Sequence, residues 1–592
     1  MDPKSVKGRP LLCFTDEDDP ATDFGVSWVR KLPKNTSSVD SLERARIWIQ
    51  QCKATPRRKS GYQVVLPGSI EDQPPPSTDH AWTIEDISRG KVDPEPFPQE
   101  RPERLLRLTT DKGDITACLI ETAGNDYEYT ILSYSWGGST NRPWLTTTEN
   151  MKEHLQSVEV RQLPPTLRDA ISITVALGFS YVWIDALCIV QDSPLDWATE
   201  TSKMGGIYRG SVVMIAASGA TSVEQGLFNT RSSSTIHEID RQYLVVLNTT
   251  LNNGRPSRLY LWHAKSLREE ISDTFQQSVL RGPLAKRGWT LQEHVMAPRT
   301  LYYTPSQLMW ECSHCRLSED NFPQHQGQKL YPMADLIYPV HPKTLVRMWY
   351  MNLVEEFSQR SFTKFEDKLP AITALAKATF FNRHIDYIAG LWKDSLMTGL
   401  CWYRKGSGRK MEDYCCPSWS WASQNSPVLY TFAERSAENP RGFAPKILSV
   451  HVEQDPLNPF GNAKAAHIML KTAVMTGIVV RGEFETKMNR RDSSLVPRTL
   501  RQGLFISSPH RKLQFRLDAI MDSEGNPGML VIVAALFGRK YGEPVFLLLT
   551  SPDIAADAYR RVGIATIAST YGEKESMDDI VSGWEERTIK LI

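Results

Sequence analysis

Two glutamates in the sequence lie about one helical turn after a tryptophan. Glu293 follows Trp289 by four residues, and Glu200 follows Trp197 by three. On a helix, either spacing puts the two side chains on a common face. Apolar surroundings raise the pKa of a carboxyl group because they disfavour its charged form. Both glutamates are therefore candidate catalytic carboxylates.

Each glutamate also has a structural interpretation. Glu293 could pair with Arg287 or Arg299, or bond a helix terminus. Glu200 falls in the first turn of a predicted helix, where an acidic side chain stabilises the helix dipole. For both residues the sequence leaves the catalytic and structural interpretations open.

Further polar residues stand where predicted strands end. Ser135 and Trp136 follow the apolar run at residues 129–134, and Asp185 closes the run at 181–185. Ligands of parallel sheets bind outside the carboxyl ends of the strands, so these three residues are candidates for ligand binding. The alternatives are a loop cap or an ion pair for Asp185, and core packing for Trp136.

The cysteines give weaker signals. Cys188 could act as a nucleophile with a histidine elsewhere in the chain, but its apolar neighbours favour a buried, unreactive thiol. Cys312 and Cys315 have the spacing of half a zinc site, but no second pair follows at a usual distance. We therefore expect no metal site. The sequence also lacks a GxxxxGK[ST] motif, which excludes a P-loop in this chain.

The order of the predicted elements indicates an α/β scaffold. A hairpin is predicted over residues 104–121, with its turn at 111–114. Three apolar runs then alternate with two helical patterns, in the order strand 129–134, helix 165–177, strand 181–185, helix 194–208 and strand 211–217. Such alternation favours a parallel sheet with right-handed crossovers.

The rest of the chain differs in composition and periodicity. Residues 219–285 are less regular and read as an insertion, which is followed by a short predicted helix at 288–296 and two predicted strands at 299–312. The sequence predicts four parts: a poorly structured lead-in with one helix (1–103), an α/β domain (104–315), a helical middle region (316–445) and a β-rich C-terminal region (446–592).

Residues 129–312 resemble the fungal heterokaryon incompatibility (HET) domain. The matching blocks include YTILSYSWG (129–137), WIDALCIVQD (183–192), GLF (226–228), RGWTLQE (287–293) and WEC (310–312). Tryptophan-containing blocks at 390–392 and 417–421 resemble regions that follow the domain in many single-chain members. At least eight of the 16 tryptophans fall in such blocks. The resemblance implies a protein of a filamentous fungus that acts in non-self recognition and regulated cell death.

The HET domain is in turn similar to TIR domains, several of which cleave NAD. This remote resemblance implies a TIR/flavodoxin-like parallel sheet with an insertion. TIR enzymes that cleave NAD place a catalytic glutamate four residues after a tryptophan, a spacing that Trp289 and Glu293 match. The implied reaction cleaves the nicotinamide–ribose bond, and a carboxylate would stabilise the oxocarbenium-like cation or position a ribose hydroxyl.

The candidate binding residues would have distinct roles in such a site. Ser135 would bind a ribose, Trp136 would stack a base, and Asp185 and Trp289 would complete an NAD site. Glu293 would be the catalytic carboxylate, with Glu200 as its rival. NAD would then be a substrate and not a resident cofactor.

Three functions stay open at this stage. The chain could be a cell-death protein that hydrolyses NAD, a non-enzymatic module that triggers death by assembling with a partner, or an accessory protein of another fungal pathway. Whether it is an enzyme is therefore undecided. A protein partner is expected in the first two cases, and self-association too, because TIR-like sites are often completed across subunits.

Charge and hydropathy limit the other partners. The chain has 592 residues, with 69 basic and 68 acidic side chains, so its net charge of +1 gives no electrostatic case for nucleic acid or an anionic membrane. The longest apolar run, residues 529–537, is shorter than the ~20 residues needed to span a bilayer. The first residues show no secretory signal, and nine cysteines then fit a reducing compartment. We expect a cytoplasmic protein.

Overall fold

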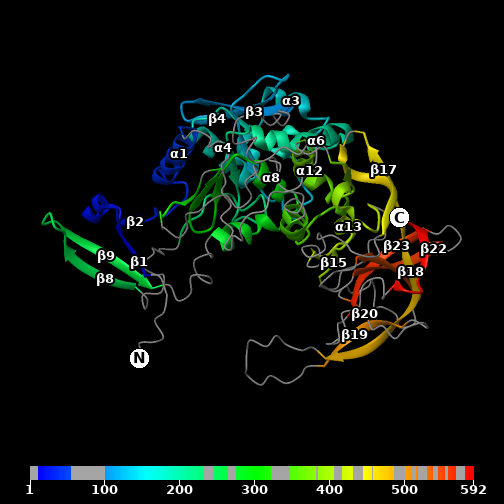
Figure 1. Cartoon of the computed structure of the whole chain (residues 1–592). Coiled ribbons are helices and arrows are strands. Elements are labelled where there is room, and N and C mark those ends of the chain that lie inside the picture. The colour runs from blue at the N-terminus through cyan, green and yellow to red at the C-terminus, as the bar shows by residue number, and fades with distance from the viewer. Residues whose placement is uncertain are drawn as a thin grey trace, which may run out of the picture. The chain divides into compact units, whose positions relative to one another are not determined.

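In the computed structural model the chain forms two compact units, residues 1–338 and 339–592. Figure 1 shows the whole chain. The structure describes residues 11–54, 100–231, 244–263, 275–313, 315–321, 347–381, 385–405, 416–430, 445–456, 458–485, 500–507, 515–517, 530–537, 545–553, 558–567 and 581–592.

The first unit is built on a mixed sheet of eight strands. Their order across the sheet is β12 (Arg316–Ser318), β11 (Leu308–Cys312), β10 (Arg299–Tyr303), β7 (Val213–Ala216), β5 (Thr130–Ser133), β6 (Tyr181–Trp183), β3 (Arg104–Asp111) and β4 (Asp114–Glu121). The four central strands β10, β7, β5 and β6 are parallel, and the outer strands pair antiparallel. The expected parallel sheet is thus confirmed for its centre alone, because hairpins extend it on both sides.

Local sequence signals account for the central elements. The β3–β4 turn contains Lys112 and Gly113 with φ of 49° and 92°, a left-handed conformation that glycine adopts without strain. Helix α4 (Pro165–Ala176) begins with proline in its first turn, and helix α6 (Pro194–Gly210) is capped by the Ser193 side chain, which accepts the backbone N–H of Asp196. Every residue of β5 and β7 is buried, as their unbroken apolar runs predict.

The other helices of the first unit are short, apart from α1. They are η2 (Pro20–Phe24), α1 (Val39–Ala54), α3 (Met151–Gln156), η3 (Val160–Gln162), α5 (Asp185–Cys188), the π-helix η6 (Gln276–Leu280), η7 (Leu284–Lys286) and α8 (Thr290–Met296). Helix α1 is the one helix predicted in the N-terminal lead-in, and α8 includes most of the segment predicted at 288–296.

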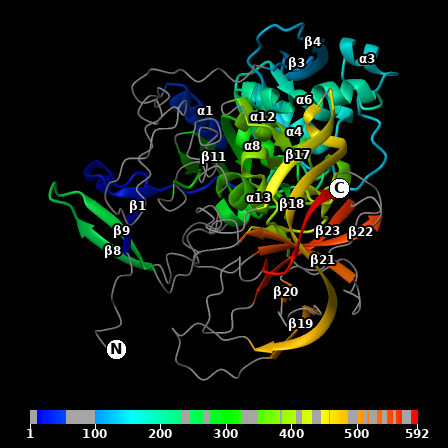
Figure 2. The ribbon, with the colours of Figure 1, turned by 45° about the vertical axis from the view of Figure 1, so that its right-hand side comes forward.

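A second, four-stranded sheet joins the N-terminal segment to the insertion. Its order is β2 (Ser27–Val29), β1 (Leu11–Asp16), β9 (Pro256–His263) and β8 (Leu244–Thr250). Both ribbon views show β1, β8 and β9 side by side (Figures 1 and 2). Residues 11–54 are therefore regular where the sequence predicts a poorly structured lead-in. Strand β1 pairs with β9, some 245 residues further along the chain, and no local sequence pattern indicates such a partner.

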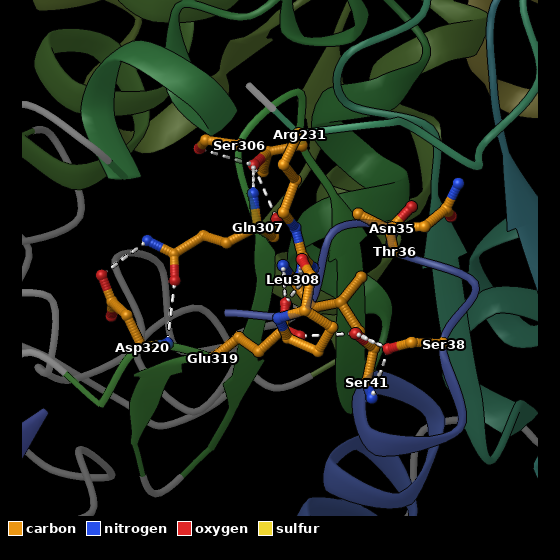
Figure 3. A network of polar contacts seen from close by, with 12 residues as sticks. Asn35, Thr36, Ser38, Ser41, Arg231, Ser306, Gln307, Leu308, Glu319 and Asp320 are labelled. Carbon is orange, nitrogen blue, oxygen red and sulfur yellow. Dashed lines mark hydrogen bonds and ion pairs between the residues drawn. The ribbon is translucent and has the colours of Figure 1, made fainter. Parts of the chain in front are cut away.

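A buried network ties the N-terminal segment to the edge of the central sheet (Figure 3). Glu319 accepts hydrogen bonds from the Ser41 hydroxyl and from the backbone N–H of Leu308, and it pairs with Arg231. The side chains of Arg231 and Glu319 are only 5% and 2% exposed. Arg231 also donates to the carbonyl of Pro33. The network thus joins three stretches that are far apart in sequence.

The first half of the second unit is mostly helical and packs around tryptophans. Its elements are the π-helix η9 (Arg347–Val354), α11 (Glu355–Phe357), η10 (Phe365–Asp367), η11 (Pro370–Ile372), α12 (Thr373–Phe381), β13 (Tyr387–Ile388), β14 (Leu391–Trp392), η12 (Lys393–Ser395), α13 (Leu396–Gly399), β15 (Tyr403–Arg404), η13 (Trp421–Ser423) and β16 (Val428–Leu429). The indoles of Trp349 and Trp421 donate to one carbonyl, that of Gly390, at 3.2 and 2.8 Å. Gly390 has φ of 96°, and a Cβ there would lie 2.8 Å from the Trp421 nitrogen, so this position requires glycine.

The second half of the unit is β-rich, as predicted. Its strands are β17 (Lys446–Asp455), β18 (Asn458–Glu485), β19 (Leu500–Ser507), β20 (Phe515–Leu517), β21 (Leu530–Phe537), β22 (Val545–Asp553), β23 (Ala558–Ile567) and β24 (Glu585–Leu591). β24 pairs antiparallel with β18 and parallel with β23, and this closes the ring β18–β21–β22–β23–β24. The division of the chain into four parts stays a prediction.

Candidate functional site

Glu293 lies at the carboxyl end of strand β5. Its side chain comes from helix α8, and the hydroxyl of Ser133, the last residue of β5, donates to Glu293 Oε2. Glu293 is only 6% exposed. The hydroxyl of Tyr208, from α6, lies against the same carboxylate.

Asp185 forms the second acidic position of this cluster. It begins helix α5 directly after strand β6, and its Oδ1 accepts the backbone N–H of Ala186 at 2.7 Å. The indole Nε1 of Trp136 donates to Asp185 Oδ2 at 2.9 Å. The Tyr134 hydroxyl lies against the same carboxylate. Two segments predicted to bind a ligand, 135–136 and 185, therefore meet.

Arg287 connects the two acidic groups. Its guanidinium donates to the carbonyl of Tyr134, and its positive charge lowers the pKa of both Asp185 and Glu293. The charge of Asp185 in turn raises the pKa of Glu293. The two carboxyl groups and the arginine thus form one electrostatic unit.

Burial dominates the ionisation of this unit. It raises the pKa of Glu293 to about 7, against the opposing effects of the Ser133 hydrogen bond and the Arg287 charge. Burial also raises the pKa of Asp185, although Tyr134, Arg287 and Trp136 favour its charged form. A carboxyl group with a pKa near 7 exchanges its proton near neutral pH, as general acids and bases require.

We predict that Ser133→Ala raises the pKa of Glu293 further. The variant removes the hydroxyl that favours the charged carboxylate and leaves burial unchanged. A carbon-detected NMR titration of the Glu293 carboxyl should show its midpoint move to higher pH. Thr130→Ala, which alters a buried hydroxyl at the other end of β5, is the control. An unchanged midpoint in Ser133→Ala would contradict the assigned hydrogen bond.

The topology places this cluster where α/β sheets bind ligands. β5 and β7 are parallel neighbours, with Ser133 opposite Ala216. Within this sheet, the strand that follows β5 is β6, which lies beside β5 on the side away from β7. The strand that follows β7 is β10, which lies beside β7 on the side away from β5. Such a switch point opens a crevice at the carboxyl ends of the two strands, and Glu293 is bonded to the last residue of β5.

Glu200 has a different environment. Its Oε1 accepts the backbone N–H of Glu103 at 3.1 Å, and Arg104 and Lys203 lie near it. Burial raises its pKa to about 7, as for Glu293. Its contacts are with the start of β3, so the two candidate catalytic carboxylates do not share one set of partners.

The remaining candidate residues flank the cluster. Trp289 directly precedes α8, and the backbone N–H of Glu293 donates to its carbonyl at 3.4 Å, which confirms the spacing of one turn. The ring of Trp289 meets the edge of Trp197, whose side chain is 36% exposed, at 6.4 Å between centroids. Ser135 is half-buried beside Trp136.

Four contributors to the cluster were not among the predicted site residues. Ser133 and Tyr134 lie in the predicted strand, Tyr208 lies in an apolar helical stripe, and Arg287 was considered only as a structural partner. A serine or a tyrosine in an apolar run is typical of a core residue, so no sequence pattern indicates that Ser133, Tyr134 or Tyr208 belongs to a site. Arg299, the other arginine considered, contacts Cys52.

The structure bears on the two alternatives for the cysteines, a nucleophilic Cys188 and a metal site. Cys188 is fully buried, and burial raises the pKa of its thiol to about 12, as expected of an unreactive thiol. Across the described ranges, no group of three or more histidine, cysteine, aspartate or glutamate side chains could hold a metal ion.

Within the part of the chain that the structure describes, every helix is too short or too polar to cross a membrane.

Comparison with known families matches residues 129–293 to the family described as heterokaryon incompatibility protein (HET). Residues 129–293 form a HET domain. The HET domain runs from the start of β5 to Glu293 in α8 and contains all six candidate site residues. No curated protein and no solved structure matches the chain.

Proposed function

We propose that this protein acts in heterokaryon incompatibility, as a cell-death protein that a recognition partner triggers. The HET domain supports this role directly. We further propose that the domain kills by hydrolysing NAD, with Glu293 as the catalytic carboxylate. The observation that carries this second step is a buried carboxyl with a pKa of about 7 at the switch point of a parallel sheet.

The proposed reaction uses one water. The bond between nicotinamide and ribose breaks, nicotinamide leaves with the bond electrons, and water adds to the ribose carbon and loses a proton. Glu293 stabilises the positive charge that develops on the ribose. Asp185 and Trp136, joined by a hydrogen bond of 2.9 Å, orient the substrate beside it. The order of the four parallel strands, β6–β5–β7–β10, fits the TIR/flavodoxin-like fold that this chemistry implies.

The burial of Glu293 bears on how the site is controlled. With 6% of its surface exposed and a hydrogen bond from Ser133, the carboxylate is closed to a substrate as large as NAD. We propose that this is the resting state, and that association with a partner or a second copy opens the site. Control by association would keep NAD intact until recognition occurs.

The same burial favours a second function. A carboxylate enclosed by Ser133, Tyr208 and Arg287 could serve only to hold α8 against the sheet. The HET domain would then be a non-enzymatic module that triggers death by assembly. On this alternative, NAD stays constant while cells die.

One experiment separates the two functions. The full chain and Glu293→Gln are expressed in a fungal host, and NAD content and viability are followed over time at matched protein abundance. Glu200→Gln is the control, since it removes another buried carboxyl whose pKa is also about 7. We expect NAD loss and death in wild type and in the control, and neither in Glu293→Gln. Full toxicity of Glu293→Gln would reject the catalytic role, and death without NAD loss would establish the assembly function.

A further inference from the structure

Three cysteines from separate segments gather at one edge of the central sheet. Cys52 lies in the last turn of α1, Cys312 ends β11, and Cys315 directly precedes β12. The sulfurs of Cys312 and Cys315 are 3.8 Å apart. The thiol of Cys52 lies against that of Cys312, so Cys312 has a cysteine neighbour on each side.

Ordinary packing holds the three thiols together. The backbone N–H of Cys312 donates to the carbonyl of Cys315 at 2.9 Å and closes the turn between β11 and β12. Helix α1 lies along β11, where the rings of Trp48 and Trp310 are 6.2 Å apart. Arg299, which is opposite Cys312 in the sheet, donates from Nε to Cys52 Sγ at 3.2 Å.

We propose that this cluster is an oxidisable thiol site in which hydrogen peroxide joins Cys312 to Cys315 as a disulfide. A disulfide bond is about 2.05 Å long, so the two sulfurs need to approach by a little under 2 Å. Cys312 ends β11 and Cys315 directly precedes β12, the neighbouring strand, whereas Cys52 is held by Arg299 on a different element. The geometry therefore favours a disulfide between Cys312 and Cys315 over a link to the helix.

The chemistry balances with peroxide as the oxidant. Cys315 is half-buried and Cys312 is 1% exposed, so peroxide meets Cys315 first: the Cys315 thiol attacks it, loses its proton, becomes a sulfenic acid and releases one water. The Cys312 sulfur then attacks the Cys315 sulfur and displaces a second water. Two thiols are oxidised and one peroxide is reduced to two waters. Shared hydrogen bonding and burial raise the pKa of Cys315, so the site should respond slowly, to sustained exposure.

The disulfide would also change how α1 is held. Drawing the Cys312 sulfur toward Cys315 moves it away from Cys52 of α1 and weakens their contact. Oxidation should therefore loosen the end of the helix that carries Cys52. Strands β10 and β7 lie between β11 and β5, whose Ser133 is hydrogen-bonded to Glu293. The proposed thiol site is therefore independent of the proposed catalytic role of Glu293.

Peptide mapping tests the assignment. The full chain carries Cys13→Ser, which removes an exposed thiol that would link two molecules, and is treated with hydrogen peroxide, alkylated and digested with trypsin without reduction. Cys312 and Cys315 lie between Arg299 and Arg316 and stay in one peptide. We expect that peptide to lose two alkylatable thiols and two hydrogen atoms, and to regain both when a thiol reductant is added.

Matched variants complete the test. Cys315→Ser should abolish the change, whereas Cys401→Ser, which alters a buried thiol of the second unit, should leave it intact. The wild-type map is informative even if Cys315→Ser fails to fold. A peptide that stays fully alkylated after treatment, or one joined to the separate peptide that carries Cys52, would overturn the assigned pair.

Discussion

Glu319→Ala should lower the free energy of unfolding of the first unit by about 3–5 kcal/mol. The substitution leaves Arg231, whose side chain is 5% exposed, without its counter-charge, and a buried ion pair broken on one side costs this much. It also removes the acceptor of the Ser41 hydroxyl and of the Leu308 amide. Urea unfolding followed by tryptophan fluorescence measures the loss.

Two comparisons show whether the unpaired charge is the cause. Glu17→Ala breaks a more exposed pair, with Arg30, and should cost about 1 kcal/mol or less. The double variant Arg231→Met with Glu319→Leu removes both charges and should recover the part of the loss that comes from the unpaired Arg231 charge, while the Ser41 hydroxyl and the Leu308 amide still lack their acceptor. Equal losses in Glu17→Ala and Glu319→Ala would contradict the special role of the buried pair.

Glu293→Gln should change how stability depends on pH. In the folded protein burial raises the pKa of Glu293 to about 7, above the ordinary value of 4.5, so the folded state binds more protons between these values. The wild type therefore loses stability relative to the variant as pH rises from about 4.5 to 7. One pKa unit corresponds to about 1.4 kcal/mol, so the relative loss is about 3 kcal/mol.

Urea unfolding of both proteins at a series of pH values measures this difference. The glutamine side chain can still accept the Ser133 hydroxyl, so the variant should be the more stable protein at pH 7. Glu200→Gln should show a similar difference, because burial raises its pKa to about 7 as well. Since the two glutamates have different partners, their effects should add in the double variant. If the plots of unfolding free energy against pH are parallel for wild type and Glu293→Gln, burial does not raise the pKa of Glu293.

The central sheet could be predicted because each of its strands is marked locally. Apolar runs such as 129–134 and 211–217, with proline or glycine at the helix ends between them, specify elements whose order leaves few topologies. The sheet of β1, β2, β8 and β9 could not be predicted in the same way. Its strands come from two regions with no periodic signal of their own, and only their pairing stabilises them.

The candidate site was predictable in part for a related reason. Trp136 and Asp185 follow parallel strands, and such strand ends meet at one edge, so their contact follows from the topology. Glu293 comes from a helix beyond the insertion, and only its spacing from Trp289 marked it. Glu200 has a similar spacing from Trp197, but a position on a helix face does not say which strand that face meets. The hydroxyl of Ser133 and the ring of Tyr208 look like core residues until the fold places them beside Glu293.

The position of β5, β6 and β7 in the middle of the sheet determines which fragment of the chain can fold by itself. A fragment that ends at the family boundaries, residues 129 and 293, keeps β5, β6 and β7 but loses β3 beside β6 and β10 beside β7. Two fully apolar strands would then present open hydrogen-bonding edges, which invites chain-to-chain pairing. The smallest fragment that retains every neighbour described here runs from residue 11 to residue 321. The segment that identifies the domain is therefore shorter than the one that must fold together.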